Sequence, residues 1–254
     1  MVTLHNLSVN LFGKEILSNI SFDLGQDKII GLIGKNGVGK STLLKTLSGF
    51  IKEYNGDIKI NKISLNNYKI KNLSKIRAFV SAQENINTEF ITVYQYLCFG
   101  RHIYLNFLGN LTQKDYDIIS KVIDETEINA LINSDIKNLS SGEFQRIQIA
   151  RALIQEPEII LLDEPTAHLD INFQIKIMKL LKKISKNIKI ICILHDINMA
   201  YKLCEKVILL KDNTIFAIGK TQDVINQKNL KTIFDCEWEL IETDKGNYFF
   251  PLIS

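Results

Sequence analysis

The sequence has little net charge and no long apolar run. Its 31 lysine and arginine residues and 28 aspartate and glutamate residues leave a formal net charge of +3, without any basic block. Nucleic acid is therefore not an expected partner, because phosphate backbones are bound by clustered positive charge. No apolar run approaches the roughly 20 residues that cross a bilayer, and residues 1–5 carry no basic region followed by an apolar core. We expect a chain without a signal peptide or membrane span, in the cytosol or held on a membrane by a partner.

Cysteine is also scarce. The four cysteines, Cys98, Cys192, Cys204 and Cys236, show no C-x-x-C spacing. Cys192 and Cys204 lie in or beside apolar runs, which favours buried reduced thiols over metal ligands or disulfides. The rest of the composition is ordinary, since 46% of the 254 residues are hydrophobic and 23% are charged. Such a chain is typical of one large globular domain or two closely joined ones.

A glycine-rich pattern occupies residues 34–42. It matches G-x-x-x-x-G-K-S/T and lies between the apolar run 29–33 and the segment 43–47. This context of strand, loop and helix is the one in which the pattern binds phosphate. Its nine residues are Gly34, Lys35, Asn36, Gly37, Val38, Gly39, Lys40, Ser41 and Thr42.

The residue types in this loop suit a nucleoside triphosphate. Glycines let backbone N–H groups turn toward phosphate oxygens, and the following helix points the positive end of its dipole at the same place. Lys40 is predicted to reach the β- and γ-phosphates, and the Ser41 hydroxyl to take one Mg²⁺ position. A turn that only joined two elements would not need glycine, lysine and serine in this register. We therefore predict that the chain binds a nucleoside triphosphate.

Apolar strands alternate with amphipathic helices along much of the chain. Short apolar runs at 29–33, 159–162 and 189–194 are typical of parallel strands buried on both faces. Helical patterns follow at 170–186 and 197–204. This alternation predicts an α/β fold with a mostly parallel sheet covered by helices.

Other regions depart from this alternation. Near the N-terminus, polar and apolar residues alternate as in half-buried strands. A helical stretch from about 86 to 152 is expected to form its own subdomain within a single domain spanning 1–254. The core then comprises about 1–85 and 153–220. The tail from about 221 to 254 is expected to be an extension of mixed helix and strand, without assigned chemistry.

Polar side chains follow several of the predicted strands. Asp163 and Glu164 come after the run 159–162, at the sheet edge where parallel sheets bind ligands. Downstream of a phosphate loop, Asp163 is predicted to hold Mg²⁺ and Glu164 to accept a proton from the attacking water. His195 is predicted to contact the γ-phosphate or that water, and Gln83 to bridge Mg²⁺ and water. Taken alone, a histidine or glutamine after a strand is more often structural, but the set predicts hydrolysis.

Residues 139–146 read Leu-Ser-Ser-Gly-Glu-Phe-Gln-Arg. They resemble the LSGGQ signature, followed by QR, of ATP-binding cassette (ABC) ATPases. The other motifs accompany it in that family's order, including the segment 167–170. The resemblance implies a P-loop NTPase with a RecA-like core, an antiparallel β part and an inserted α-helical subdomain that carries the signature. It also implies ATP and Mg²⁺ as ligands, and a head-to-tail dimer of two copies with two ATPs held between phosphate loop and signature.

The signature departs from the family pattern at one place. Ser140 and Gly142 match the phosphate-contacting serine and second glycine, whereas Ser141 stands where the first glycine is usual. Glu143 is a common variant of the glutamine, and Asp170 is a further position expected to contact nucleotide. Since serine suits a helix N-terminus, we expect Ser141 to leave dimer closure intact.

Two neighbouring residues are candidates for the position that stacks on adenine. The family places an aromatic ring before the first turn, and counting back from the phosphate loop gives Leu11, with Phe12 as the adjacent ring. Either Phe12 stacks on the base after a shift of one residue, or stacking is weak. An equally good interpretation of Phe12 is a plain core aromatic.

The segment 92–101 resembles one found in importers of iron chelates, haem and vitamin B12, where it reads T-V-x-E-x-V-x-x-G-R. In that group it borders the groove that receives a helix of the permease. We expect Tyr94, Tyr96 and Tyr104 to face this partner, because tyrosine anchors interfaces. We expect Val93, Leu97 and Phe99 to be buried in the core of the helical subdomain.

The resemblance thus implies an ATPase subunit on the cytoplasmic face of a membrane. Its partners would be a second copy, two integral-membrane permease subunits and, indirectly, a substrate-binding protein. The expected cargo is a ferric chelate, then haem, then cobalamin. One alternative is a soluble ABC-type clamp in DNA repair or translation, which usually carries coiled-coil insertions or two cassettes. Another is a kinase with the same loop, which would not need the signature.

Overall fold

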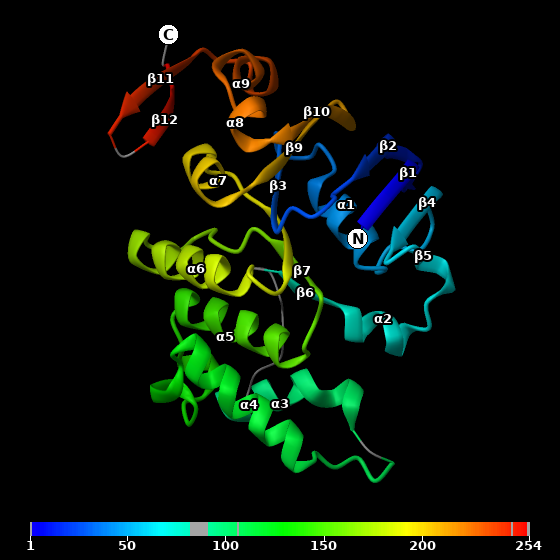
Figure 1. Cartoon of the computed structure of the whole chain (residues 1–254), viewed down its shortest axis with the longest axis vertical. Coiled ribbons are helices and arrows are strands. Elements are labelled where there is room, and N and C mark those ends of the chain that lie inside the picture. Colours follow the sequence, from blue (N-terminus) through cyan, green and yellow to red (C-terminus); the bar gives the residue numbers. More distant parts are fainter. Residues whose placement is uncertain (1, 82–90, 106, 245, 253–254) are drawn as a thin grey trace. The chain divides into compact units, whose positions relative to one another are not determined.

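The computed structural model describes residues 2–81, 91–105, 107–244 and 246–252 (Figure 1). The chain divides into two compact units, which we call the first unit (Met1–Tyr68 with Lys189–Ser254) and the second unit (Lys69–Ile188). The division expected from the sequence, with boundaries near 85, 152 and 220, is a different one and remains a prediction. Gln83 lies outside the described residues.

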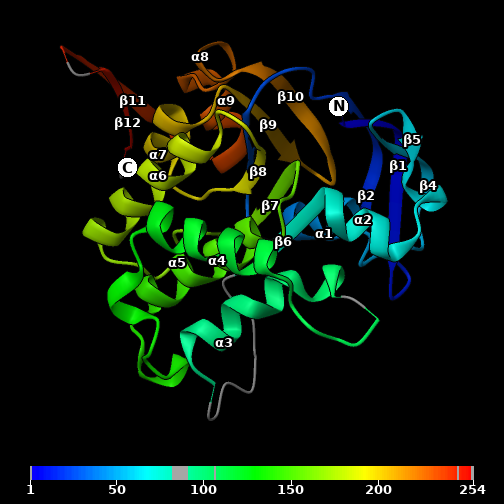
Figure 2. The same cartoon turned by 60° about the horizontal axis from the view of Figure 1, so that its bottom comes forward.

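The first unit opens with an antiparallel sheet in the order β2-β1-β4-β5 (Figure 2). Its strands are β1 (Val2–Leu11), β2 (Lys14–Asp23), β4 (Asn55–Ile60) and β5 (Ile63–Ser64). The alternating pattern of the N-terminal residues is confirmed as strand. Its phase slips at Asn6, whose φ is 50°, where the pairing of β1 with β2 shifts register. Such a bulge bends a strand and adds to its twist.

A second group of strands in the first unit is built around β3 (Ile29–Ile33). It pairs in parallel with β8 (Lys189–Ile193) and with β9 (Lys206–Lys211). β10 (Thr214–Lys220) pairs with β9 in the antiparallel direction. All five residues of β3 are buried, as the sequence pattern predicted. Because β3 and β8 run parallel, the residues that follow them leave the sheet at the same edge.

The remaining elements of the first unit are short. They are α1 (Lys40–Leu47), η1 (Leu65–Asn67), α7 (Ile197–Leu203), α8 (Thr221–Val224), α9 (Gln227–Phe234), β11 (Trp238–Thr243) and β12 (Gly246–Pro251). The last two form an antiparallel hairpin. Cys192 and Cys204 are buried and free, as predicted.

The second unit combines a parallel strand pair with helices. β6 (Arg77–Ser81) pairs with β7 (Ile159–Asp163), and Ser81 is opposite Asp163. Its helices include α2 (Ile70–Ile76), α3 (Val93–Cys98), α4 (Gln113–Thr126), α5 (Ser141–Ile154) and α6 (Ile171–Ile184). Short 3-10 turns are η2 (Phe99–Tyr104), η3 (Asn129–Leu131) and η4 (Ile136–Asn138). In the described parts of the chain, no helix combines the length and apolarity that a bilayer crossing requires.

Candidate functional site

In the first unit, the side chain of Lys40 is hydrogen-bonded to the backbone of its own phosphate loop. Lys40 is buried, and its Nζ donates to the carbonyl oxygens of Gly34 at 2.7 Å and Lys35 at 2.9 Å. Two polar bonds thus hold the amino group across the loop. A phosphate bound in the loop would present charged oxygen atoms to the Lys40 ammonium. Such charged acceptors form stronger hydrogen bonds than carbonyl oxygens do.

Two glycines are required by the shape of this loop. Gly37 and Gly39 have φ values of 81° and 98°, a region that residues with a β-carbon rarely adopt. A β-carbon on Gly39 would also lie 2.7 Å from the Ile16 carbonyl oxygen and 2.6 Å from Leu17 Cδ2. Gly39 is the N-cap of α1, so the start of this helix presents backbone N–H groups to the loop. Ser41 and Thr42 follow in its first turn and are half-buried.

His195 lies at the same sheet edge as the phosphate loop. Ile193 of β8 and Leu32 of β3 are parallel partners. His195 comes two residues after Ile193, and Gly34 comes two residues after Leu32, so the two residues leave the sheet at equivalent positions. The imidazole is exposed. The neighbouring Asp196 has a separate task, because its carboxylate accepts from the Met199 N–H at 2.9 Å and caps α7.

In the second unit, β7 (Ile159–Asp163) ends at Asp163 and Glu164 follows it directly, at the strand end that the sequence predicted. Both are half-buried. Glu164 has a φ of 55°, which is uncommon for a residue with a long side chain. Strained backbone of this kind persists only where surrounding structure enforces it, and it gathers at functional sites. The same φ occurs at Glu127 and Asp235, which end α4 and α9, so the angle by itself does not distinguish Glu164 from a residue at the end of a helix.

The signature residues form the start of α5. Ser140 is the N-cap, and its Oγ accepts from the Glu143 N–H at 3.3 Å. The Glu143 carboxylate accepts from the Ser140 backbone N–H at 2.9 Å and from its hydroxyl at 2.6 Å. These bonds from Ser140 lower the pKa of Glu143. The variant glutamate thus completes a capping box, while Ser140 and Ser141 stay exposed.

Gly142 has a packing role that its motif did not reveal. A β-carbon on Gly142 would stand 2.3 Å from Cγ of the Phe173 ring on α6. Asp170 caps that helix, because its carboxylate accepts from the Phe173 N–H at 2.9 Å. The starts of α5 and α6 are therefore in direct contact, and contact of Asp170 with nucleotide remains a prediction.

Phe12 lies on the surface. It is fully exposed, so its interpretation as a core aromatic is wrong. Phe12 and Gly13 form the two-residue turn between β1 and β2, with φ values of 51° and 76°. Two left-handed residues are typical of a type I′ hairpin turn, where glycine or asparagine is usual and phenylalanine is not.

The aromatic residues of segment 92–101 are arranged differently from the prediction. Tyr96 is completely buried and packs against Phe144, with ring centroids 5.9 Å apart. Phe99, expected in the core, is 53% exposed. Val93 and Leu97 are buried as predicted, and Tyr94 is exposed. Tyr96 lies three residues after Val93 and shares its face of α3, whereas Phe99 lies beyond the end of this helix, in η2.

Tyr104 is held beneath a buried arginine. The Arg101 guanidinium lies 3.8 Å from the centre of the Tyr104 ring. Arg101 Nε donates to Asp115 at 2.7 Å, and its Nη1 donates to the Ile154 carbonyl at 2.9 Å and to Glu156 at 2.8 Å. This network joins η2 to α4 and to the end of the signature helix α5. Phe107 and Leu108, which follow in the chain, are exposed, and we refer to the exposed residues Tyr94, Phe99, Phe107 and Leu108 as the aromatic surface.

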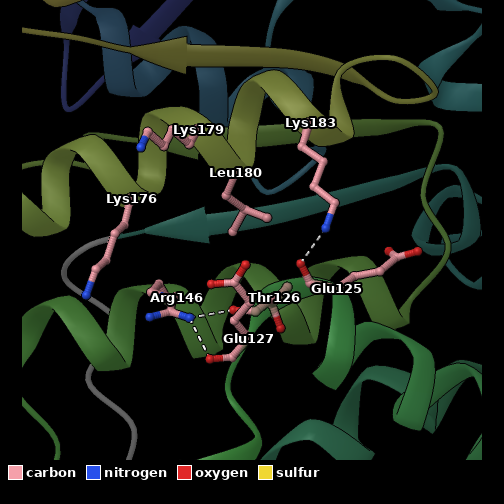
Figure 3. Close-up of a pocket in the computed structure, with 8 residues that line it drawn as sticks. All are labelled: Glu125, Thr126, Glu127, Arg146, Lys176, Lys179, Leu180 and Lys183. Atoms are coloured by element: carbon pink, nitrogen blue, oxygen red, sulfur yellow. Dashed lines mark hydrogen bonds between the residues drawn. The ribbon is translucent and has the colours of Figure 1, made fainter.

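A pocket of about 150 Å³ lies among α4, α5 and α6 (Figure 3). Its lining residues are Glu125, Thr126, Glu127, Arg146, Lys176, Lys179, Leu180 and Lys183. Arg146 donates to the carbonyls of Thr126 at 2.6 Å and Glu127 at 2.7 Å, and Lys183 to that of Glu125 at 2.9 Å. These bonds satisfy carbonyls that α4 leaves at its C-terminal end. The pocket's basic residues thus hold α4 beside the signature helix.

Each unit carries one residue with an oxygen ligand of the kind that a nucleotide-bound magnesium ion takes from a protein. Mg²⁺ prefers hard oxygen ligands and usually takes one or two from the protein when phosphates supply others. The Ser41 hydroxyl and the Asp163 carboxylate are ligands of this kind. Among the described residues, no cluster of three or more histidine, cysteine, aspartate or glutamate side chains offers an all-protein metal site.

Comparison with known proteins identifies relatives over the whole chain. A family model described as ABC transporter matches residues 17–167. A hemin import ATP-binding protein of Escherichia coli O157:H7 is 32% identical over 100% of this chain and 98% of its own length. A solved structure of a transporter assigned to the metal-chelate ABC type, in an inward-facing conformation, has a TM-score of 0.85 and 25% identity, covering 99% of this chain and 97% of that one. A dimeric ATP-binding cassette bound to ADP and phosphate has a TM-score of 0.74 and 28% identity, covering 87% and 99%.

Proposed function

Because the chain belongs to the ABC transporter family, we propose that it is the ATP-hydrolysing subunit of a membrane importer. The observation that carries this proposal is the exposed helix start at Ser140, with its complete capping box, on the same chain as a phosphate loop. A kinase with the same loop would have no use for such a second phosphate-binding helix. The P-loop NTPase fold expected from the sequence agrees with the solved relatives.

In this proposal, ATP binds with its phosphates in the loop 34–42. Lys40 Nζ exchanges the carbonyls of Gly34 and Lys35 for the β- and γ-phosphates. Backbone N–H groups at the start of α1 bind the same oxygens. Mg²⁺, when bound, neutralises phosphate charge during transfer. Ser41 and Asp163 would hold it, with Gln83 as the predicted bridge to the attacking water.

The remaining residues act on the water and the γ-phosphate. Glu164 accepts the proton of the attacking water. Its left-handed backbone conformation sets the direction in which its side chain leaves the main chain. His195, exposed at the edge from which the phosphate loop also leaves the sheet, contacts the γ-phosphate or the water. Each of these groups is placed at a strand end, where rigid elements position side chains most accurately.

We propose that the active form is a head-to-tail dimer. Ser140 and Ser141 are exposed at the start of α5, and this helix start would meet the γ-phosphate bound by the other copy. The similar cassette bound to ADP and phosphate is dimeric, which supports the formation of a dimer. A phosphate loop then forms one half of each site, and the signature and Asp170 of a second copy form the other half.

The aromatic surface is the proposed contact with two permease subunits at the cytoplasmic face of the membrane. Its exposed rings, Tyr94, Phe99 and Phe107, are of the kind that anchors interfaces. Iron chelates come first as cargo and haem second, supported by the hemin import relative and the metal-chelate type structure, with cobalamin behind them. A substrate-binding protein would choose the cargo.

Two experiments test this function. The purified chain should hydrolyse ATP, and Lys40→Ala should abolish both binding and turnover. The chain should also co-purify with a permease from membranes, and the reconstituted complex should transport a ferric chelate, haem or cobalamin when each is offered in turn. A monomer that hydrolysed ATP at full rate would overturn the dimer, and a complex that moved none of these cargoes would overturn the importer assignment.

A further inference from the structure

The C-terminal extension reaches the phosphate loop through one ion pair. Lys35, the second residue of the loop, pairs its Nζ with Oδ2 of Asp235 (both in the first unit). The two side chains are 47% and 66% exposed. An exposed ion pair of this kind contributes little to the stability of the fold. Its possible effect is therefore on the charge of the phosphate loop beside it.

Asp235 is held there by rigid structure. It follows α9 directly, with a φ of 55°, and its N–H donates to the Lys231 carbonyl at 2.9 Å. The helix is anchored by the buried Leu230 and Ile233. Lys211, at the end of β9, donates to the Thr232 carbonyl at 2.8 Å. The carboxylate is therefore presented to the loop by the fold.

The extension also braces the helix that follows His195. Asn198 on α7 forms two hydrogen bonds with the backbone of Phe249 on β12, accepting from its N–H at 2.7 Å and donating to its carbonyl at 3.0 Å. The rings of Tyr201 and Phe249 lie 5.3 Å apart. The C-terminal extension thus contacts both the phosphate loop and the helix that follows His195.

Lys35 is close to the group that will meet the phosphates. Its own carbonyl accepts from Lys40 Nζ at 2.9 Å. Charges act over about 8 Å at physiological salt, so an unpaired ammonium on Lys35 would add to the positive potential that attracts a polyphosphate. The charged groups near this point are Lys35, Lys40 and Lys211, with Asp235 as the carboxylate among them.

We propose that Asp235 is a positioning residue that sets the nucleotide affinity of the phosphate loop, because its carboxylate neutralises the Lys35 ammonium. This inference rests on the proposed function as an ATPase. The pair leaves the loop with the charge of Lys40 alone, so nucleotide binds less tightly and leaves more readily. The C-terminal extension can therefore change the affinity for nucleotide, since any movement of α9 that takes Asp235 away from Lys35 strengthens nucleotide binding.

A charge series at these two positions tests the proposal. The dissociation constant for ATP is measured by titration calorimetry on the full chain. We expect Asp235→Asn to bind ATP about threefold more tightly, and Lys35→Ala about threefold more weakly, from Coulomb interactions across roughly 10 Å of water and protein surface. The double variant, in which neither charge remains, should return to within about twofold of the natural chain. Asparagine suits the left-handed backbone at 235, so that variant keeps its fold.

Three controls separate this role from a structural one. Glu237→Gln removes the carboxylate of another exposed ion pair of the same extension, Lys231–Glu237, and should leave affinity unchanged. Lys35→Arg keeps the charge at position 35, so Asp235→Asn should still tighten ATP binding when it is combined with Lys35→Arg. The affinity change of Asp235→Asn should shrink at 1 M salt, where charges act over about 3 Å, and KM should fall while kcat does not rise.

The outcomes are decisive. If Asp235→Asn binds ATP equally or more weakly, or if Glu237→Gln has the same effect, the proposal is wrong. A natural chain that binds no ATP would instead overturn the proposed function, so the two failures are distinguishable.

Discussion

The ring of Phe173 occupies the space into which a β-carbon on Gly142 would project, with Cγ only 2.3 Å away. The signature glycine is therefore needed for packing within one subunit, besides any contact with phosphate across a dimer. A clash with Cγ cannot be relieved by turning the ring about its axis, because Cγ lies on that axis. The whole Phe173 side chain would have to change its rotamer.

We predict that Gly142→Ala lowers the free energy of unfolding. Overpacking typically costs about 1–3 kcal/mol, against a usual gain of about 1 kcal/mol when alanine replaces glycine in a helix. Urea unfolding measures the difference, and Ser141→Gly, exposed in the same turn, is the matched control with an expected change below about 1 kcal/mol. In a Phe173→Ala background the loss should disappear. If it persisted there, the clash would not be its cause.

The same control variant tests the departure in the signature. Since Ser141 is exposed at the helix start, Ser141→Gly should change the ATPase rate by less than tenfold, which corresponds to about 1.4 kcal/mol. Steady-state turnover of the full chain measures it. A larger gain would show that serine impairs closure.

Glu164→Gln should separate binding from chemistry. The amide keeps the size of the side chain but cannot take a proton from water, so ATP binding and dimer closure should persist while turnover falls by about 10²–10⁴-fold. Size-exclusion chromatography with ATP and a phosphate-release assay measure the two effects. Glu239→Gln, an exposed carboxylate on β11, is the control. Normal hydrolysis by Glu164→Gln would reject the general-base role.

Phe12→Ala should weaken ATP binding by roughly fivefold, since an aromatic stacking contact contributes about 1 kcal/mol. The ring is exposed at a hairpin turn, so protein stability should hardly change. Affinities for ATP and GTP are compared by titration calorimetry. Phe50, also exposed in the first unit, supplies the control variant Phe50→Ala. Equal affinities for Phe12→Ala and the natural chain would mean that adenine is bound without this ring.

Asp115→Asn should destabilise the second unit and change its response to acid. Burial disfavours the charged carboxylate, but hydrogen bonds from Thr112 and Arg101 outweigh it and lower the pKa of Asp115. A lowered pKa stabilises the fold above the unfolded value of about 3.9, and this contribution is lost as pH falls through the folded value. We expect a loss of about 3 kcal/mol at pH 7, because the buried Arg101 Nε loses its charged partner and the guanidinium keeps only the contacts of Nη1 with Glu156 and the Ile154 carbonyl.

Urea unfolding from pH 7 to pH 3 measures both effects. The stability difference between the natural chain and Asp115→Asn should narrow as pH falls below about 4. Asp117→Asn, on the exposed face of the same helix, should leave the stability profile unchanged. A constant difference across the pH range would contradict the assignment of the charge.

Much of the fold could be predicted from the sequence because the strands are short, apolar and bounded by clear breaks. β3 and β8 lie where the apolar runs indicated, and the helix start at Ser140 follows from a capping box that is legible in four consecutive residues. The aromatic residues show the limit of such reasoning. Tyr96 and Phe99 exchanged their expected places, because α3 ends at Cys98 and Phe99 begins the 3-10 turn η2, a boundary that the sequence pattern did not locate.

By itself the sequence determined which chemical groups are present: a lysine within a glycine-rich loop, two adjacent carboxylates at the end of a buried strand and a serine that caps a helix. Each depends on neighbours along the chain, so a local pattern is enough to identify it. Only the tertiary structure decided that Phe12 is exposed, that Phe173 requires a glycine at 142, and that Asp235 meets a phosphate-loop lysine 200 residues away. Exposure and long-range contact depend on what packs over a side chain, and no local pattern specifies that.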